Sequence, residues 1–184
     1  MVDISKSNIN SLLKEVLGTS VYILAVLLIA LFTVKFIGQR TVVIGQSMER
    51  TLSNGDNLIV DKISYRLHDP ERFDIVVFPY RNDRTQKFVK RIIGLPGETV
   101  QIIDGVIYIN GEVLEEYYGK EFMVDGGIAI DPILLSEDEY FVLGDNRNNS
   151  MDSRVAEVGN IKRDELIGRV WIRITPFSEF CKVE

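Results

Sequence analysis

The chain has 184 residues, which is room for one catalytic domain of ordinary size and an additional segment, but not for two catalytic domains. Its net charge of −6 at pH 7 argues against a surface that binds nucleic-acid phosphates. One histidine and one cysteine, Cys181, supply few metal ligands and no intramolecular disulfide. We therefore expect no nucleic-acid partner, no metal and no cofactor.

The first predicted element is a membrane anchor. Val16 to Val34 carry no charge over 19 residues, and a helix of that length spans the ~30 Å hydrocarbon core of a bilayer. A buried helix of a soluble core would keep a polar face. A cleavable signal peptide has a shorter apolar run and a small-x-small cleavage pattern, which "KFIGQR" lacks. We expect a tail (residues 1–15), an uncleaved anchor (16–37) and one further domain (38–184).

The charges beside this segment do not decide its orientation. Lys6 and Lys14 precede it, but two acidic residues on the same side offset them, and Lys35 and Arg40 follow it. The positive-inside rule therefore favours neither orientation.

From residue 40 onward the pattern predicts strands, because short runs of β-branched and aromatic residues alternate with Gly, Pro, Asn and Asp. Asp104-Gly105 and Asn110-Gly111 are two-residue hairpin signals, since these residues adopt positive φ at little cost. One short helix is predicted from Ser47 to Gly55, and residues 115–139 are expected to be a peripheral insertion. The predicted strands lie in residues 57–63, 73–78, 87–95, 99–104, 106–111, 139–145 and 168–174.

The stretch "VVIGQSMERTL" places one serine, Ser47, shortly after the apolar segment. His68, the chain's single histidine, lies in the polar stretch "SYRLHDPER", which is typical of a solvated surface. A lysine can activate a serine instead, if burial against apolar groups lowers the pKa of its ammonium.

"KFVKRIIGLPG" offers such a lysine. In a strand, Lys90 shares a face with Phe88 and Ile92, and Arg91 lies on the opposite face, so one of the two adjacent cations must point toward an apolar layer. Arginine stays protonated in proteins, which makes Lys90 the candidate base. The alternative is an edge strand whose two cations both reach water.

The third unusual segment is "FVLGDNRNNSMDSR", residues 141–154. A calcium loop is excluded, because Arg147 occupies the third ligand position and no glycine stands at the sixth. An exposed, Asx-rich turn is one alternative. The density of opposite charges and hydroxyl groups fits better a hydrogen-bonded brace, residues 145–154, that holds a neighbouring site rigid.

Taken together, these segments resemble the type I signal peptidases, membrane-bound serine proteases of the S26 family, in their Gram-positive bacterial form. The resemblance covers the chain from the anchor to about residue 175. Its last stretch is the most specific, whereas "SM" alone means little. The matching stretches, in the family's order, are "SM" at Ser47 with Leu52, "GDNLIVDKISYRLHDPERFDIVVF", "KFVKRIIGLPGE" around Lys90, and "GDNRNNSMDSR".

The resemblance implies a Ser-Lys dyad in which Ser47 is the nucleophile and Lys90 its general base. Ser150 would hydrogen-bond the lysine, and the backbone N–H of Ser47 would bind the oxyanion. Some family members add a serine hydroxyl two positions before the nucleophile, but here that position is Gly45. Arg50 stands where the family usually has proline, and we expect it to loosen the turn after Ser47.

The resemblance also implies supporting and substrate-binding residues. Asp152 would pair with Arg154, and Asp145 with Arg91. An extended signal peptide would add to the strands that carry residues 42–46 and 87–90. The residues expected to contact it are Val43, Gly45, Gln46, Met48, Leu52, Phe88 and Val89.

The implied fold is a mostly β, signal-peptidase-like coiled domain with a shallow groove and one N-terminal transmembrane helix. The implied function is removal of signal peptides from exported preproteins by a monomer in the cell membrane, with a cytoplasmic N-terminus and an extracytoplasmic catalytic domain. A membrane-anchored β-rich binding module is the alternative, but a decayed enzyme has no reason to keep Ser47, Lys90 and Ser150 together. A self-cleaving repressor protease would carry a DNA-binding domain where the anchor lies.

Overall fold

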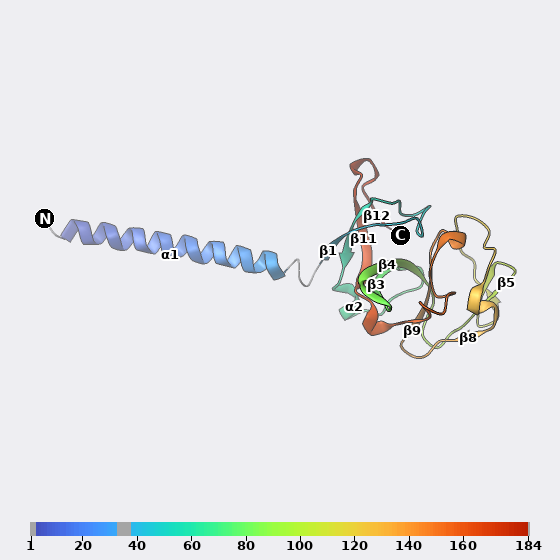
Figure 1. Cartoon of the computed structure of the whole chain (residues 1–184). Coiled ribbons are helices and arrows are strands. Elements are labelled where there is room, and N and C mark those ends of the chain that lie inside the picture. Colours follow the sequence, from blue (N-terminus) through green and yellow to red (C-terminus); the bar gives the residue numbers. More distant parts are fainter. Residues whose placement is uncertain (1–2, 33–37, 184) are drawn as a thin grey trace. The chain divides into compact units, whose positions relative to one another are not determined.

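The computed structural model describes residues 3–32 and 38–183, which form two compact units divided after Gly38. The first unit is a single helix, α1 (Asp3–Phe32), shown in Figure 1. Within it, Leu12–Leu31 is apolar and long enough to cross a membrane, and its side chains are exposed. α1 thus begins within the predicted tail (residues 1–15) and continues through most of the predicted anchor (16–37). Residues 33–37 of that anchor lie outside the described residues.

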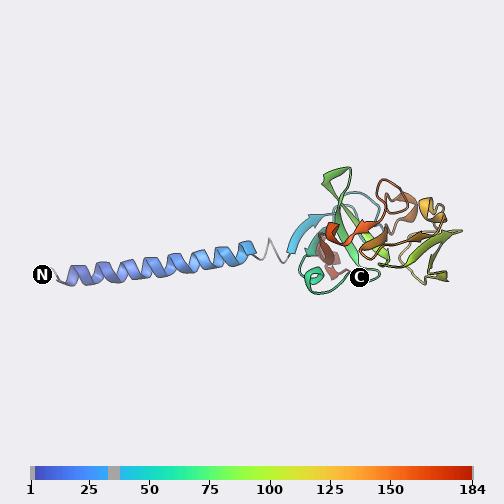
Figure 2. The ribbon, with the colours of Figure 1, turned by 90° about the horizontal axis from the view of Figure 1, so that it is seen from below.

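The second unit is built mainly of antiparallel strands in two sheets (Figures 1 and 2). The larger sheet has the order β1-β2-β11-β3-β4-β9-β10, and β12 pairs with β11. Its strands are β1 (Gly38–Val42), β2 (Asn57–Asp61), β3 (Ile75–Tyr80), β4 (Asp83–Gly94), β9 (Glu139–Leu143), β10 (Ile161–Lys162), β11 (Gly168–Thr175) and β12 (Cys181–Lys182).

The smaller sheet has the order β7-β6-β5-β8 and lies at one end of this unit (Figures 1 and 2). Its strands are β5 (Thr99–Ile103), β6 (Val106–Ile109), β7 (Glu112–Val113) and β8 (Ile133–Leu134). The short helices of the unit are α2 (Ser64–Leu67) and the 3-10 turns η2 (Gly127–Ile130), η3 (Arg147–Asn149), η4 (Arg163–Glu165) and η5 (Phe177–Glu179).

All seven predicted strands are present, as β2, β3, β4, β5, β6, β9 and β11, and the mostly β prediction is confirmed. Both hairpin signals are also confirmed. Asp104 and Gly105 have φ of 47° and 74°, and Asn110 and Gly111 have φ of 53° and 83°, which are the two positive values that a type I′ turn needs. β1 and the two-residue strands β7, β8, β10 and β12 are too short or too polar to have been predicted.

The predicted short helix at Ser47 is wrong. Residues 46–52, which we call the Ser47 turn, form a hydrogen-bonded turn in which the N–H groups of Thr51 and Leu52 both donate to the carbonyl of Met48. Arg50 has φ of 97°, outside the right-handed helical region, so a helix cannot continue through it.

Three buried apolar clusters hold these elements and place the Ser47 turn. One cluster joins the two sheets, with Val100 and Ile102 packed against Phe141 and Leu143 of β9. A second contains Met48 and Leu52 of the Ser47 turn together with residues of β2, β3 and β11. Each buried side chain of this size contributes roughly 1.5–3 kcal/mol, so the turn is anchored to the sheet on both sides of Arg50. The third cluster packs β3, β4, β9 and β10 on Tyr65.

β4 carries Lys90 and Arg91 and pairs with β3 and β9. Lys90 lies opposite Val76 of β3, and Arg91 lies between Ile75 of β3 and Leu143 of β9. Because β9 pairs with β4 only from Arg91 onward, residues 83–90 form no ladder with β9 on that edge. The same strand therefore delivers one cation to each face of the sheet and leaves one edge free beside Lys90.

Candidate active site

Ser47 and Lys90 meet at the edge of β4. The Nζ atom of Lys90 donates a hydrogen bond to Oγ of Ser47 at 2.6 Å, although the two residues are 43 positions apart in the chain. Strand alternation points Lys90 away from Arg91, and the packing of Met48 and Leu52 brings the Ser47 turn over it. The arrangement gives a hydroxyl group and an amine in direct contact, the first requirement of a serine-lysine nucleophile.

The side chain of Lys90 is only 4% exposed, which excludes the alternative of a solvated edge cation. Burial lowers the pKa of Lys90 to about 8, because removal of water disfavours the charged ammonium. The carboxylates of Asp152 and Asp145 act in the opposite direction, and the charge of Arg154 adds to the lowering. A lysine with this pKa is partly neutral near neutral pH and can accept a proton.

Gly45 and Asn146 set the backbone around Ser47. Gly45 has φ of 101°, and its N–H donates to Oδ1 of Asn54 at 2.9 Å. A serine at this position would have to adopt a conformation that side chains rarely take, so the additional oxyanion hydroxyl does not suit this backbone. Asn146 donates from its backbone N–H to the carbonyl of Ser47 at 3.0 Å and from Nδ2 to the carbonyl of Gln46 at 3.1 Å. This buried asparagine lies in the predicted brace, but no role was predicted for it from the sequence.

The brace contains both of the ion pairs that the resemblance implied. Arg91 and Asp145 are fully buried and form two parallel hydrogen bonds, 2.9 Å from Nε to Oδ1 and 2.8 Å from Nη2 to Oδ2. Thr51 of the Ser47 turn donates its hydroxyl to the same carboxylate at 2.5 Å. This pair thus fixes one end of the Ser47 turn through a planar, bidentate contact.

Asp152 and Arg154 form the second pair, again bidentate, at 2.8 and 2.9 Å. The Oδ2 atom of Asp152 also accepts from the N–H of Gly144 at 3.1 Å. A Cβ atom on Gly144 would lie 2.5 Å from the carbonyl oxygen of Ser47 and 2.2 Å from Oγ of Ser150. Glycine is therefore required there for the brace to approach the Ser47 turn, a role that the sequence alone did not indicate.

The expected hydrogen bond from Ser150 to Lys90 is not formed. Within residues 3–32 and 38–183, Oγ of Ser150 and Nη2 of Arg147 are the buried side-chain polar atoms without a hydrogen-bond partner. Ser150 lies against Gly144, and the described bond of Lys90 goes to Ser47. The resemblance thus predicted a residue that lies near Ser47, but its predicted hydrogen bond to Lys90 is wrong.

The residues expected to contact substrate fall into two groups. Val43, Met48 and Leu52 belong to the buried core, the latter two with 1% of their surface exposed. Phe88 and Val89 of β4 are half-buried, and Gly45 and Gln46 are exposed. All of them lie on the Ser47 turn, just before it, or next to Lys90. Their contact with substrate remains a prediction.

His68 is exposed at the end of α2, and its contacts in the described chain are backbone ones. Cys181 is a free, exposed thiol. Across the described residues, no group of three or more His, Cys, Asp and Glu side chains is placed to hold a metal ion.

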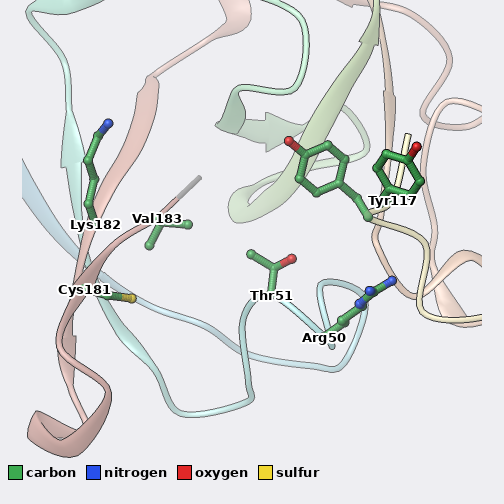
Figure 3. A pocket seen from close by; sticks show the side chains of 7 residues that line it. Arg50, Thr51, Tyr117, Cys181, Lys182 and Val183 are labelled. Carbon is green, nitrogen blue, oxygen red and sulfur yellow. The ribbon is translucent and has the colours of Figure 1, made fainter. Parts of the chain in front are cut away.

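Two features near the site were not predicted. The segment expected to be peripheral, residues 115–139, contributes residues 116–124, which contact both the Ser47 turn and the brace. Between the Ser47 turn, this segment and β12 lies a cavity of about 310 Å³ (Figure 3). Arg50 and Thr51 line it from the turn, facing Tyr117 and the chain from Cys181 to Val183. The cavity is adjacent to the dyad, but Ser47 and Lys90 do not line it.

The expectation that Arg50 loosens the turn also needs correction. Its Nη1 atom donates to the carbonyl of Gly119 at 2.8 Å, which ties the turn to a second segment. Proline has φ fixed near −65° and could not adopt the φ of 97° found at this position.

Comparisons with known proteins identify the family of this chain. The family model described as signal peptidase, peptidase S26, matches residues 16–175. The probable signal peptidase I-2 of a Synechocystis species is 41% identical over 165 residues, which cover 87% of this chain and 72% of the relative. Signal peptidase I of Bacillus amyloliquefaciens is 35% identical over 178 residues, 93% of this chain and 94% of the relative.

A solved signal peptidase I from Enterococcus faecalis is 38% identical, with a TM-score of 0.47 over 55% of this chain and 97% of that one. The family match covers the apolar helix, the Ser47 turn, β4 and the brace in a single alignment. The chain therefore belongs to the signal peptidase family, peptidase S26.

Proposed function

We propose that this chain is a membrane-bound serine endopeptidase that removes signal peptides from exported preproteins with a Ser-Lys dyad. The observation that carries the proposal is the 2.6 Å contact between Lys90 Nζ and Ser47 Oγ, made by a lysine that burial holds at a pKa of about 8. The family assignment supports this substrate class, and the geometry supports these catalytic roles.

In the first half of the reaction, neutral Lys90 accepts the hydroxyl proton of Ser47 as Oγ attacks the scissile carbonyl carbon. The resulting oxyanion is stabilised by the backbone N–H of Ser47, a donor worth roughly 3 kcal/mol in comparable sites. When the C–N bond breaks, the Lys90 ammonium gives its proton to the leaving amine of the mature protein. The signal peptide remains as an ester on Ser47.

In the second half, Lys90 takes a proton from a water molecule that attacks the ester. The acyl–oxygen bond breaks, Ser47 regains its proton from Lys90, and the signal peptide leaves with a new carboxylate. The negative charges of Asp145 and Asp152 oppose the effect of burial, so the pKa of Lys90 stays at about 8 and does not fall further.

Substrate would bind as an extended segment along the edge of β4 that β9 leaves free beside Lys90. Backbone hydrogen bonds to this edge would hold the segment in register by strand addition. Small side chains one and three positions before the cut would face Val43, Met48, Leu52, Phe88 and Val89. The limited exposure of these residues favours small substrate side chains over large ones.

We also propose that the predicted anchor, residues 16–37, crosses the cell membrane once, with residues 1–15 in the cytoplasm. The exposed apolar stretch Leu12–Leu31 of α1 supports membrane insertion. The peptidase domain, residues 38–184, would lie outside the cytoplasm, because the cleavage site of a signal peptide emerges there. We expect the chain to act as a monomer.

Incubation of the purified full chain with a preprotein in detergent, followed by sequencing of the new N-terminus, tests the proposal. We expect one cut directly after the signal peptide, and no cut with Ser47→Ala. A binding module without turnover would retain the intact preprotein. Cleavage by Ser47→Ala at the parent rate would refute the assignment of the nucleophile.

A further inference from the structure

Residues 116–124 form a strap that contacts the two residues in the middle of the Ser47 turn. Nη1 of Arg50 donates to the carbonyl of Gly119 at 2.8 Å, and Nζ of Lys120 pairs with Oε2 of Glu49 at 2.7 Å. Across the described residues, these are the only hydrogen bonds or ion pairs that the side chains of Glu49 and Arg50 make. The middle of the turn is thus held by the strap.

The strap is itself fixed to the Arg91–Asp145 ion pair. The N–H of Lys120 donates to the carbonyl of Asp145 at 2.8 Å, and the ring of Tyr118 lies 3.6 Å from Cζ of the buried Arg91. The carbonyl of Phe73 accepts from the same arginine, and the Phe73 ring packs on Tyr118 at 5.1 Å.

Further along the brace, the strap is held at both of its ends. Glu116 pairs with Arg147 at 2.6 Å. The side-chain amide of Asn148 bonds to the carbonyl of Phe122 and to the N–H of Val124, so it binds two backbone groups of the strap at once. The strap is therefore held in one position by contacts along its length.

Three consecutive strap residues join the two parts of the site. Tyr118 covers Arg91, Gly119 accepts from Arg50, and Lys120 contacts both Glu49 and Asp145. Figure 3 shows the same neighbourhood from the side of the cavity, with Arg50 on the turn and Tyr117 on the strap. The left-handed backbone of Arg50, with φ of 97°, is unfavourable for a residue with a side chain. The contact with Gly119 helps to hold it.

We propose that the strap positions the nucleophile, and that Glu49, Arg50 and Lys120 are positioning residues for the reaction. They touch neither the substrate nor Lys90, and act by fixing the direction in which the turn presents Oγ of Ser47. The inference rests on the proposed function for its rate measurements, but not for its structural measurement.

The sharpest test reverses the Glu49–Lys120 ion pair in the full chain in detergent, with Glu49→Lys, Lys120→Glu and the double variant. Both side chains are partly exposed, 27% and 43%, so the pair adds little to stability. We expect each single reversal to lower kcat on the preprotein about tenfold with KM changed less than about twofold, because a small misplacement of a nucleophile is costly. The double variant should recover most of kcat.

Amide hydrogen exchange of residues 46–52 supplies the readout that does not depend on activity. Exchange in this segment should be faster by about three- to fivefold in each single reversal and should return toward the parent rate in the double variant. If the parent chain failed to cleave any preprotein, the proposed function would be wrong, whereas the exchange data would still decide whether the strap holds the turn.

Arg50 provides a second, independent pair of variants. Arg50→Gly tolerates the positive φ but removes the guanidinium, and Arg50→Lys keeps a donor for Gly119. We expect Arg50→Gly to lower kcat with little change in KM, and Arg50→Lys to restore most of it.

The matched control is Arg81→Gln, which removes an ion pair of similar exposure with Glu165, outside the strap and the Ser47 turn. It should leave both kcat and the exchange of residues 46–52 unchanged. The proposal is overturned if the single reversals keep kcat within about twofold of the parent, in the range of ordinary surface substitutions. It is also overturned if kcat falls without faster exchange, or if the double variant is no better than the single ones.

Discussion

Lys90 is 4% exposed, and its Nζ atom lies 2.6 Å from Oγ of Ser47, so under the proposed mechanism its pKa sets the pH range in which the serine can be activated. Burial lowers that pKa from 10.5 to about 8. At about 1.4 kcal/mol per pKa unit, this shift costs the folded state roughly 3 kcal/mol at pH values below the folded pKa. Between pH 8 and 10.5 the unfolded chain binds the additional proton, so stability rises with pH across this window.

Substitutions of Lys90 separate this cost from catalysis. Lys90→Met removes the buried charge and should be at least as stable as the parent at pH 7, whereas Lys90→Arg places a permanent charge in the same site and should be less stable. Urea unfolding of the full chain in detergent, at pH 7 and at pH 10, measures both. A Lys90→Met chain clearly less stable than the parent at pH 7 would mean that Lys90 is stabilised as an ammonium.

His68 is the control, because no catalytic role is assigned to it. It is exposed, so His68→Ala should change kcat/KM less than about tenfold, whereas loss of a triad histidine costs several orders of magnitude. Cleavage of the preprotein by the purified variant measures the ratio. A loss of a thousandfold or more would show that histidine, and not lysine, activates Ser47.

Among the elements, the brace combines packing with electrostatics. Arg91 and Asp145 are fully buried, lie on β4 and just after β9, and hold Thr51 of the Ser47 turn. Two strands and the turn therefore share one ion pair. Loss of either partner leaves the other charge buried without compensation.

Asp145→Asn should lower the free energy of unfolding by about 3–5 kcal/mol, because it leaves the Arg91 guanidinium unpaired in the core. Denaturant unfolding measures the change. Glu165→Gln, which disrupts the more exposed pair with Arg81, is the control and should cost less than about 1 kcal/mol. If the two substitutions lowered the free energy of unfolding equally, the claim that the buried Arg91–Asp145 pair contributes more than the exposed pair would be wrong.

The strands, including the one that carries Lys90, could be predicted because they depend on the local sequence pattern. Alternation along residues 87–95 directs Lys90 and Arg91 to opposite faces, and the two Asx-Gly pairs require positive φ wherever they stand. The ion pairs and the role of Ser47 came from the resemblance rather than from spacing. Local pattern thus predicts the strands, and the resemblance predicts that Ser47 and Lys90 are the reacting side chains.

The rest depends on contacts between distant parts of the chain. Residues 116–124 have no hydrophobic period and meet the Ser47 turn some 70 positions away, so no local pattern indicated the strap. The close approach at Gly144 and the double anchor by Asn146 arise from the same packing. The predicted helix at Ser47 failed because the backbone of Arg50 is left-handed, which propensity does not foresee.

At the scale of the whole molecule, we propose that the first unit anchors the chain in the membrane and that the second unit carries out cleavage. The apolar helix Leu12–Leu31 exposes side chains that favour a bilayer over water, and the β unit contains both Ser47 and Lys90. The contact between Ser47 and Lys90 thus lies entirely within the second unit.

The proposed topology is tested by adding a protease to intact spheroplasts. We expect digestion of the domain after residue 38, with α1 and the preceding tail protected, and full digestion only after lysis. Protection of the whole chain in intact spheroplasts would place the domain in the cytoplasm and contradict the topology.

The pH dependence of kcat/KM for preprotein cleavage, in the parent and in Lys90→Met, tests the Ser-Lys dyad most directly. Because the base must be neutral, the parent rate should rise with pH and level off above a pKa of about 8, and Lys90→Met should show no cleavage at any pH. Substantial cleavage by Lys90→Met, or a parent rate that already levels off below pH 6, would contradict the account.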